Sequence, residues 1–331
     1  MTIRRSLVVL ATAATCAVGG TTPAGAATQE VPRTPRFAVS QATRPMADFD
    51  GDGKADIAIY RPVDSVWQIR QSSNGAFSSR QWGDSHDMPV PADYDGDGKA
   101  DLAMWSPSSM TWYVERSSDR RVIYQALTDV PPPDYGDYGT LYPVVGDFTG
   151  DGKADFGMMF KRWYGVDWHQ AALFKIQGLT GWSDRGEAWD GDQPTPAIVA
   201  GDYDGNGTTD VASIWLTPFD SWWQFSKSGS GVPEVEWGAQ PDVEVVGDFD
   251  GDHKDDVAIY RDADAGSTHI RLSTGGTTRI PWNPGTPVPA DYDGDRIDDI
   301  ATWTNGVWNI RYSTGVVKPA PTLGQAGEIP I

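Results

Sequence analysis

Hydrophobic and polar residues alternate with a period of two along most of the chain. Short runs of this kind are DIAIY (56–60), DLAMW (101–105), DVAIY (256–260) and DIATW (299–303). Each is followed by a turn and a second alternating run, as in VWQIRQSS (66–73), TWYVERSS (111–118), SWWQFSKS (221–228) and VWNIRYST (307–314). The runs are rich in β-branched and aromatic residues and are bounded by turn residues, which predicts antiparallel strands.

An acidic segment occurs six times, just before an alternating run in each repeat. Its copies are ADFDGDGKAD from Ala47, ADYDGDGKAD from Ala92, GDFTGDGKAD from Gly146, GDYDGNGTTD from Gly201, GDFDGDHKDD from Gly247 and ADYDGDRIDD from Ala290. The leading aspartates are spaced by 45, 54, 55, 46 and 43 residues. Repeats of this length, each with four short strands, are typical of β-propeller blades.

The predicted fold is therefore all-β, a β-propeller of four-stranded blades. Six blades are favoured, and there are seven if one of the longer intervals contains a degenerate repeat. A solenoid is the alternative, but it needs polar caps at both ends. LGQAGEIPI (323–331) aligns without gaps with WGDSHDMPV (82–90), the segment before an acidic loop. We expect the C-terminal strand to pair into the first blade and close the ring, which removes both open edges.

The N-terminus has the pattern of an export signal over residues 1–26. Arg4 and Arg5 precede an apolar stretch at 7–18, and AGA at 24–26 matches a cleavage site. That stretch is too short to span a bilayer, and no later segment predicts a membrane anchor. We expect a secreted, extracellular protein, exported by the Sec or the twin-arginine route. Residues 27–44 are expected to form a flexible lead-in, and residues 45–331 the propeller.

The charge balance excludes some classes of partner. The chain has 46 Asp and Glu against 26 Lys and Arg, a net charge of -20. Nucleic acids and anionic membranes need a basic face, so neither is expected as a partner. The single cysteine, Cys16, lies in the predicted signal, so the mature chain would have no disulfide. Stability must then come from the core, from metal ions or from both.

The acidic loop has the spacing of a calcium-binding loop. Counted from its first aspartate, it offers side-chain oxygens at positions 1, 3, 5 and 9 and a backbone carbonyl at position 7. These are the ligands of a D-x-D-x-D-G loop, in which hard oxygens converge on one Ca²⁺. Glycine at positions 4 and 6 permits the sharp turn. Position 12 holds Ile59 instead of the glutamate of an EF-hand, so the loop would stand on a β scaffold.

The predicted ligands, loop by loop, are Asp48, Asp50, Asp52, Lys54 and Asp56; Asp93, Asp95, Asp97, Lys99 and Asp101; Asp147, Asp151, Lys153 and Asp155; Asp202, Asp204, Asn206, Thr208 and Asp210; Asp248, Asp250, Asp252, Lys254 and Asp256; and Asp291, Asp293, Asp295, Ile297 and Asp299. Up to six Ca²⁺ ions are expected, with the first two sites the tightest. The third loop, with Thr149 in place of an aspartate, should bind most weakly. His253 and Arg296 replace the glycine at position 6 and should strain the fifth and sixth turns, and Arg296 should also repel a cation. Asp-Gly runs are ordinary turn residues too, but six loops with the same ligand spacing favour metal sites.

At these loops the chain resembles the FG-GAP/VCBS repeat family, which includes the integrin α-subunit propeller. The likeness extends from Met46 to Ile331 and rests on the six acidic loops. It implies calcium in the loops and extracellular binding of proteins or carbohydrate. More distantly, the chain resembles secreted bacterial propellers of the dispase autolysis-inducing kind, which implies a modulator of a secreted protease or a transglutaminase substrate. The step from such a fold to an activity is an analogy.

The sequence gives no support for a catalytic site. Its four histidines are scattered over different repeats, and no H-E-x-x-H or G-x-S-x-G motif is present. We expect a non-catalytic, monomeric module that binds an extracellular protein; a lectin-like propeller is the alternative, and a hydrolase or lyase is the least favoured. Aromatic residues that recur in each repeat, such as Tyr60 and Trp67, are expected in the core. Those outside the repeat pattern are candidates for partner binding: Trp163, Tyr164, Trp168, Trp182, and Tyr135 and Tyr138 of the insertion at 131–142.

Overall fold

The computed structural model describes residues 47–128, 142–164, 169–178, 181–191, 197–216, 220–226, 232–318 and 321–331. The chain divides into two units, Met1–Arg36 and Phe37–Ile331, and every described residue belongs to the second. The predicted export signal and lead-in therefore lie outside the described residues.

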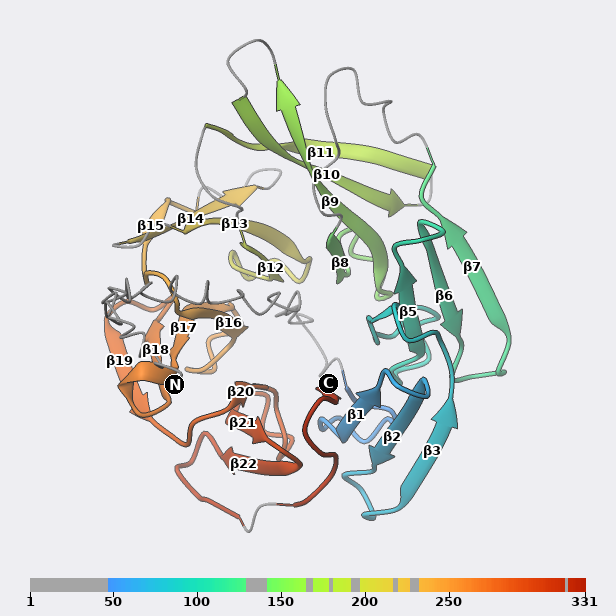
Figure 1. Ribbon diagram of the computed structural model, residues 1–331. Coiled ribbons are helices and arrows are strands. Elements are labelled where there is room, and N and C mark those ends of the chain that lie inside the picture. Colours follow the sequence, from blue (N-terminus) through green and yellow to red (C-terminus); the bar gives the residue numbers. More distant parts are fainter. Residues whose placement is uncertain are drawn as a thin grey trace, which may run out of the picture. The chain divides into compact units, whose positions relative to one another are not determined.

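The described chain is all-β and forms antiparallel sheets, one for each acidic repeat (Figure 1). The first sheet has the order β23-β1-β2-β3, with β1 (Ile57–Arg61), β2 (Val66–Arg70), β3 (Phe77–Gln81) and β23 (Ile329–Pro330). The second contains β4 (Met88–Pro89), β5 (Leu102–Ser106), β6 (Thr111–Glu115) and β7 (Val122–Ala126). The third contains β8 (Tyr142–Gly146), β9 (Asp155–Tyr164), β10 (His169–Gly178) and β11 (Gly181–Gly191).

The remaining sheets follow the same order. The fourth contains β12 (Ala197–Gly201), β13 (Asp210–Leu216), β14 (Ser221–Ser226) and β15 (Val235–Glu236). The fifth contains β16 (Val243–Gly247), β17 (Asp256–Arg261), β18 (Ser267–Arg271) and β19 (Thr277–Pro281). The sixth contains β20 (Thr286–Pro287), β21 (Ile300–Thr304) and β22 (Val307–Arg311). The arrangement is that of a β-propeller with four-stranded blades.

The prediction of six four-stranded blades is wrong in one blade. Five sheets have four strands, and the sheet of the sixth repeat has three. Where its fourth strand would lie, the described residues form only isolated bridges, Arg311 with Val317 and Val307 with Thr322. Pro321 lies between them in the chain and has no N–H with which to continue a ladder.

The C-terminal strand pairs with the first blade, as its sequence predicts. Ile329 and Pro330 of β23 lie opposite Tyr60 and Ile59 of β1 in an antiparallel register. The amide of Ile331 donates to the carbonyl of Ala58 at 3.0 Å. The first blade is thus assembled from both ends of the second unit.

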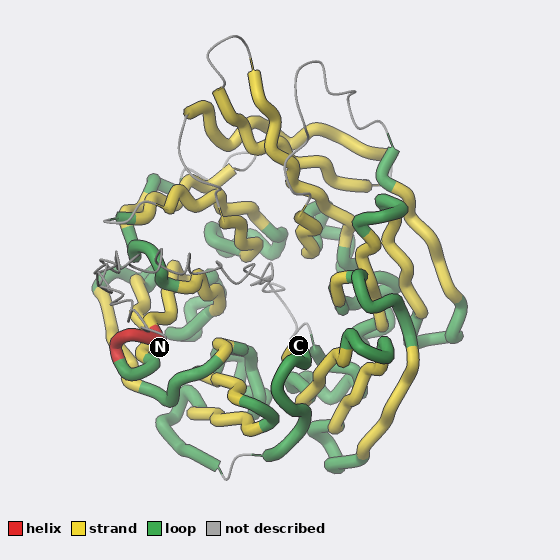
Figure 2. The backbone as a smooth tube through the Cα atoms, in the orientation of Figure 1, coloured by secondary structure: helices red, strands yellow, loops and turns green. Residues whose placement is uncertain are grey.

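Large aromatic side chains fill the interior of the described chain. Figure 2 shows how loops join its consecutive strands. Trp67, Trp105, Trp112, Trp223 and Trp308 are each 0% exposed. Hydrophobic clusters combine neighbouring repeats: Ile59 of the first packs with Trp303 and Trp308 of the sixth, for example. The prediction that the recurring aromatic residues form the core is confirmed.

The helical content of the described chain is a single 3-10 turn, η1 (Asp262–Asp264). No helix among the described residues is long and apolar enough to cross a membrane.

Candidate metal centres

The first aspartate of each acidic loop organises the turn that follows it. In the first loop, Asp48 Oδ1 accepts hydrogen bonds from the amides of Gly51 at 2.6 Å and Asp52 at 3.2 Å, and its Oδ2 accepts one from Gly53 at 2.8 Å. Gly51 and Gly53 have φ angles of 81° and 84°, in the left-handed region that glycine adopts without strain. The carboxylate and the two glycines therefore fold the loop tightly around one point.

The last aspartate connects this turn to the hairpin between the second and third strands of the blade. Asp56 is 0% exposed, and its Oδ2 accepts from the amide of Phe49 at 2.9 Å. Its Oδ1 accepts from the amide of Ser72, which follows β2, at 2.7 Å. The second, fifth and sixth loops repeat this arrangement with Ser117, Ser273 and Ser313.

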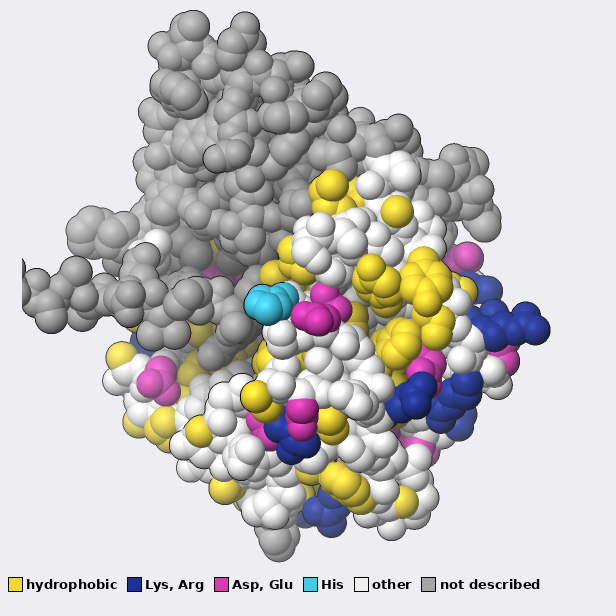
Figure 3. Space-filling view, turned by 45° about the vertical axis from the view of Figure 1, so that its right-hand side comes forward, with side chains coloured by type: hydrophobic (Ala, Val, Ile, Leu, Met, Phe, Trp, Pro, Cys, Tyr) yellow, Lys and Arg dark blue, Asp and Glu magenta, His cyan; other side chains and the backbone are white. Residues whose placement is uncertain are grey.

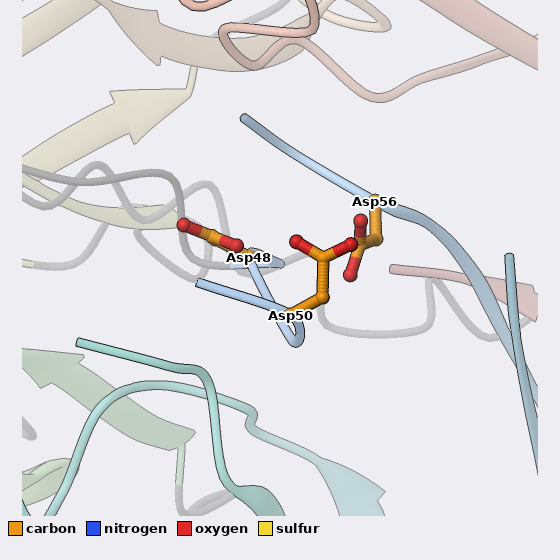
Figure 4. Close-up of side chains that lie close together, drawn as sticks. All are labelled: Asp48, Asp50 and Asp56. Carbon is orange, nitrogen blue, oxygen red and sulfur yellow. The ribbon is translucent and has the colours of Figure 1, made fainter. Parts of the chain in front are cut away.

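Carboxylates converge in five of the six loops. In the first, one oxygen from each of Asp48, Asp50 and Asp56 lies within 4.8 Å of the others (Figure 4). Equivalent groups at positions 1, 3 and 9 are Asp93, Asp95 and Asp101; Asp202, Asp204 and Asp210; and Asp248, Asp250 and Asp256. In the sixth loop the group is Asp291, Asp293 and Asp295.

The third loop is the exception among the described residues. Asp147 still accepts from the amides of Gly150 and Gly152, at 2.6 and 2.8 Å. At position 3, however, Thr149 places its amide 2.9 Å from Asp155 Oδ2, and no group of three acidic ligands forms there. Asp151, at position 5, accepts from the amide of Lys153, as position 5 also does in other loops.

Position 5 lies outside the groups of three carboxylates in the first, second, fourth and fifth loops. Its side chain instead closes a local turn: Asp52, Asp97, Asn206 and Asp252 each accept from the amide at position 7, at 2.8–3.0 Å. Those amides belong to Lys54, Lys99, Thr208 and Lys254. A ligand role for positions 5 and 7 therefore stays a prediction.

Two loops carry a side chain at position 6, and the turn keeps its shape. His253 and Arg296 have φ angles of 67° and 69°, a region that costs a non-glycine residue about 1 kcal/mol or more. Their amides still donate to Asp248 and Asp291 at 2.8 Å. The strain expected from the sequence is present in both loops.

The groups fit a hard divalent cation. Asp250 Oδ1 and Asp293 Oδ1 are buried and accept no hydrogen bond within the described structure. A buried carboxylate oxygen without a donor is costly, and a cation coordinated by the surrounding oxygens would satisfy it. Ca²⁺ prefers a set made only of oxygens, drawn from carboxylates and carbonyls. Each group could therefore hold one Ca²⁺, which would neutralise carboxylates and join the acidic turn to its blade.

Burial also perturbs the protonation of these carboxylates. It raises the pKa of Asp56, Asp101 and Asp155 to about 6, and the pKa of Asp256 and Asp299 to about 7, with repulsion from other loop aspartates adding to the effect. Burial likewise raises the pKa of Asp48, Asp202 and Asp248. In the absence of a cation, the charged form of each group is thus disfavoured.

A serine pair next to the acidic loop was not assigned a role from the sequence. Ser72 Oγ donates to Asp52 at 2.9 Å, and Ser73 Oγ donates to Asp50 at 2.6 Å. The same contacts recur with Ser117 and Ser118, with Ser273 and Thr274, and in part with Ser313. The signal was the recurrence of Ser-Ser or Ser-Thr after the second strand of each of these repeats. The hydroxyls of the pair donate to the carboxylates at positions 5 and 3 and so orient these carboxylates.

The six loops are also hydrogen-bonded to one another in sequence. The amide at position 8 of each loop donates to the carbonyl at position 1 of the loop before it. The pairs are Ala100 to Asp48, Ala154 to Asp93, Thr209 to Asp147, Asp255 to Asp202, Asp298 to Asp248 and Ala55 to Asp291, at 2.7–2.9 Å. A cation in one loop would therefore act on a backbone that its neighbours share.

The predicted partner-binding residues are only partly described. Trp163 and Tyr164 lie in β9 and Trp182 in β11, but their side chains are outside the described part of the structure. Tyr135, Tyr138 and Trp168 lie outside the described residues altogether. Their role stays a prediction.

Comparison with known families identifies the repeat. Residues 93–157, which contain the second and third acidic loops, match the model of the FG-GAP-like repeat. The fold and this match define the class: the protein is a β-propeller that carries FG-GAP-like repeats. The family resemblance seen in the acidic loops is confirmed.

Among solved structures, the chain is similar to TolB from Acinetobacter baumannii, with a TM-score of 0.52 and 13% identity over 83% of this chain and 65% of that one. The chain spans less than two thirds of TolB, and the likeness shows the fold alone. AofleA from Arthrobotrys oligospora gives a TM-score of 0.46 and 12% identity, over 89% of this chain and 97% of that one. No curated protein matches the chain significantly.

Proposed function

We propose that the protein is a secreted, calcium-stabilised β-propeller that binds another extracellular protein and has no catalytic activity of its own. The observation that carries the calcium assignment is the convergence of three carboxylates in five loops, with buried oxygens in two of them that no donor satisfies. Secretion rests on the signal-like residues 1–26. With calcium at about 100 times Kd, each filled site stabilises the fold by about 2.7 kcal/mol.

The C-terminal strand completes this scaffold. In the proposed protein, the pairing of β23 with β1 closes the ring. Glu328 lies 3.7 Å from Arg61 and accepts from the amide of Gln325, while Asp242 in the fifth blade holds Arg261 at 2.7 Å and accepts from the amide of Ala239. The chain end thus makes the same type of contact as an internal blade. This parallel supports closure.

A serine, a histidine and an aspartate do come together in the fifth blade, but their geometry favours a structural role. Ser267 Oγ and His269 Nε2 both lie near the same oxygen of Asp264, at 2.7 and 3.1 Å, and Arg279 Nε donates to that oxygen at 2.7 Å. In a catalytic triad the serine and the acid contact different nitrogens of the histidine. Ser267 is also 0% exposed, so no substrate could reach its hydroxyl.

A carbohydrate ligand is the second candidate, because aromatic rings lie on the described surface. Tyr124 is 66% exposed and packs edge-on against Tyr113 with ring centroids 5.4 Å apart, and Phe77 is 58% exposed. Hydrophobic side chains gather beside basic side chains on the face shown in Figure 3. Exposed rings of this kind can stack on sugar faces, so a glycan array is the appropriate second screen.

The test uses the chain from residue 27 to 331. Metal analysis after dialysis against calcium, followed by thermal unfolding with and without EDTA, should show several bound Ca²⁺ ions and a lower Tm in EDTA. Asp50→Asn should reduce the calcium content by one ion, whereas Asp64→Asn, which changes an exposed carboxylate of the same blade, should not. A chain without bound Ca²⁺ and with a Tm that ignores EDTA would overturn the proposal.

Binding is tested by capture from culture supernatant with and without chelator. Retention of a protein by the calcium-loaded form supports the favoured function. Sugar binding without any protein partner would transfer the assignment to the lectin-like alternative.

A further inference from the structure

The first two acidic loops have the same ligands but different surroundings. DFDGDGKAD and DYDGDGKAD differ only at Phe49 and Tyr94, neither of which is a predicted ligand. In the second loop, however, Arg116 Nε donates to Asp95 Oδ2 at 3.0 Å. This oxygen belongs to one of the three converging carboxylates.

The guanidinium of Arg116 is fixed in this position by several contacts. It lies 3.6 Å from Asp119 and donates to Ser118 Oγ at 3.3 Å. The side chain of Asp95 is 7% exposed and that of Arg116 is 32% exposed, so the pair is partly shielded from water. Although burial alone would raise it, hydrogen bonds from Ser118 and Arg116 hold the pKa of Asp95 below its ordinary value.

The equivalent residue is uncharged in the first, fifth and sixth loops, whereas in the fourth repeat it is Lys227, which lies outside the described residues. The residue before the serine that binds the last aspartate is Gln71 in the first blade, Leu272 in the fifth and Tyr312 in the sixth. The Gln71 side chain accepts from Asn74 at 3.2 Å, and Asp50 Oδ2 accepts from the amide and hydroxyl of Ser73. Among the first, second, fifth and sixth loops, only the second has a basic residue at this position.

We infer that Arg116 is a built-in counter-cation of the second loop and lowers its affinity for Ca²⁺ below that of the first. This rests on the proposed function, in which the loops hold calcium. A single positive charge in contact with a ligand carboxylate repels a divalent ion by an amount equal to about tenfold in affinity, even at the dielectric constant of water. The expectation that the second loop is one of the two tightest sites would then fail.

The same contact stabilises the second loop when no ion is bound. Arg116 neutralises part of the carboxylate charge and joins the β6–β7 hairpin to the loop, which in the first blade is left to the serines and the cation. The first site would fill at low calcium and the second at higher calcium. The protein would thus change its ion content over a range of calcium concentrations instead of at a single threshold.

The experiment exchanges the two residues. Calcium titration calorimetry of residues 27–331 should show that Arg116→Gln raises the affinity of one binding step by about tenfold and leaves the number of sites unchanged. Gln71→Arg should lower the affinity of another step by a similar factor. Asp95→Asn in each background should remove the step that Arg116 controls and so assign it.

Arg121→Gln is the matched control, because it removes the same charge from the same hairpin. Arg121 is 80% exposed and lies 3.6 Å from Asp119, with no loop carboxylate as its partner. Its isotherm should match that of the unaltered chain. Circular dichroism in EDTA checks that each variant folds. If Arg116→Gln does not fold, Gln71→Arg still tests whether a basic residue at this position lowers the calcium affinity of its loop.

The outcomes separate the inference from the proposed function. If calcium binds but Arg116→Gln leaves every step unchanged, or shifts it no more than Arg121→Gln does, the role of Arg116 is wrong and the calcium sites stand. If no form of the chain binds calcium, the proposed function itself fails.

Discussion

The six contacts between successive acidic loops are of two kinds. In each, the amide at position 8 of one loop donates to the carbonyl at position 1 of the loop before it, and the two kinds differ in the residue that precedes position 1. In three of them alanine stands both at position 8 and before position 1: Ala100 and Ala47, Ala154 and Ala92, and Ala55 and Ala290. In the other three a glycine faces a larger side chain: Gly146 with Thr209, Gly201 with Asp255, and Gly247 with Asp298. We call these the alanine junctions and the glycine junctions.

The glycines are required by the close approach of the neighbouring loop. A Cβ added to Gly146 would lie 2.5 Å from Thr209 Cγ2, and one added to Gly201 would lie 2.5 Å from Asp255 Oδ2. Two of these junctions also gain a hydrogen bond, since Asp255 accepts from the amide of Asp202 at 2.6 Å and Asp298 from that of Asp248 at 3.0 Å. Glycine therefore precedes position 1 wherever the facing position 8 carries a side chain larger than alanine, and at two of the three glycine junctions that side chain also accepts a hydrogen bond.

The largest effect is expected from removing calcium. Several sites at about 2.7 kcal/mol each outweigh any single substitution. The two glycine junctions with aspartate at position 8 should loosen most, because burial and, after it, repulsion from Asp255 raise the pKa of Asp298 well above its ordinary value. Hydrogen exchange in EDTA should accelerate more at 248–256 and 291–299 than at 48–56, and added calcium should reverse it. Equal acceleration in all loops would remove this distinction.

Exchanging the junction types tests the size rule directly. Gly201→Ala should destabilise the fold by about 2–3 kcal/mol, because the new methyl group displaces Asp255 from its hydrogen bond. The double variant Gly201→Ala/Asp255→Ala recreates an alanine junction and should recover part of the loss, since Val246 Cγ1 still lies 2.8 Å from the added Cβ. Urea unfolding in saturating calcium measures both. A double variant no more stable than the single one would contradict the rule.

The loops should also differ in how acid affects calcium binding, through burial and repulsion within each loop. Burial raises the pKa of Asp56 and Asp101, in loops with alanine at position 8, to about 6, and that of Asp256 and Asp299, in loops with aspartate there, to about 7. Because these values exceed that of an unfolded aspartate, about 3.9, protonation stabilises the ion-free fold. That contribution is complete below about pH 4 and is lost as the pH rises through 6 to 7.

Calcium binds the deprotonated form, so its stabilising effect should grow over the same range. The first and second loops should reach full affinity about one pH unit below the fifth and sixth, and each unit below the pKa should cost about tenfold. Calcium titrations between about pH 5.5 and 8.5 in steps of about one unit should resolve two phases. A single phase for all sites would mean that the loops titrate alike.

The repeats predicted most of the fold because their information is local. Period-2 runs such as 57–60 and turn residues around Gly51 act within a few positions, and the aspartates of one loop converge within nine residues. The sixth blade was predicted to have four strands but has three, because Pro321 interrupts the segment in which the fourth strand was expected.

What could not be predicted depends on contacts between distant residues. Gly201 and Asp255 are far apart in the chain, and nothing in either repeat shows that their sizes must match. Arg116 stands in an ordinary strand end, and only the geometry of the hairpin brings its guanidinium to Asp95. Asp255 and Asp298 look like additional acidic residues of a loop, although each faces a neighbouring loop instead of its own cluster.

The smallest effect separates the two glycines inside one loop. Gly51 and Gly53 both have positive φ angles, so alanine should cost each about 1 kcal/mol. A Cβ on Gly51 would also lie 3.0 Å from Lys99 Cγ of the next loop, whereas a Cβ on Gly53 would meet nothing within 4 Å. Gly51→Ala should therefore be less stable than Gly53→Ala by about a further 1 kcal/mol in urea unfolding.

This difference should disappear when the neighbouring side chain is shortened. Lys99→Ala removes the chain that lies over Gly51, so the added methyl group at Gly51 would keep only an ordinary contact with the carbonyl oxygen of Gly98 at 3.6 Å. The two alanine variants should then be equally stable in the Lys99→Ala background. The fifth and sixth loops already follow this logic, because they replace the glycine at position 6 with His253 and Arg296 but keep Gly251 and Gly294 at position 4. A persistent gap between the two variants would show that the conformation of Gly51, and not the neighbouring loop, requires glycine there.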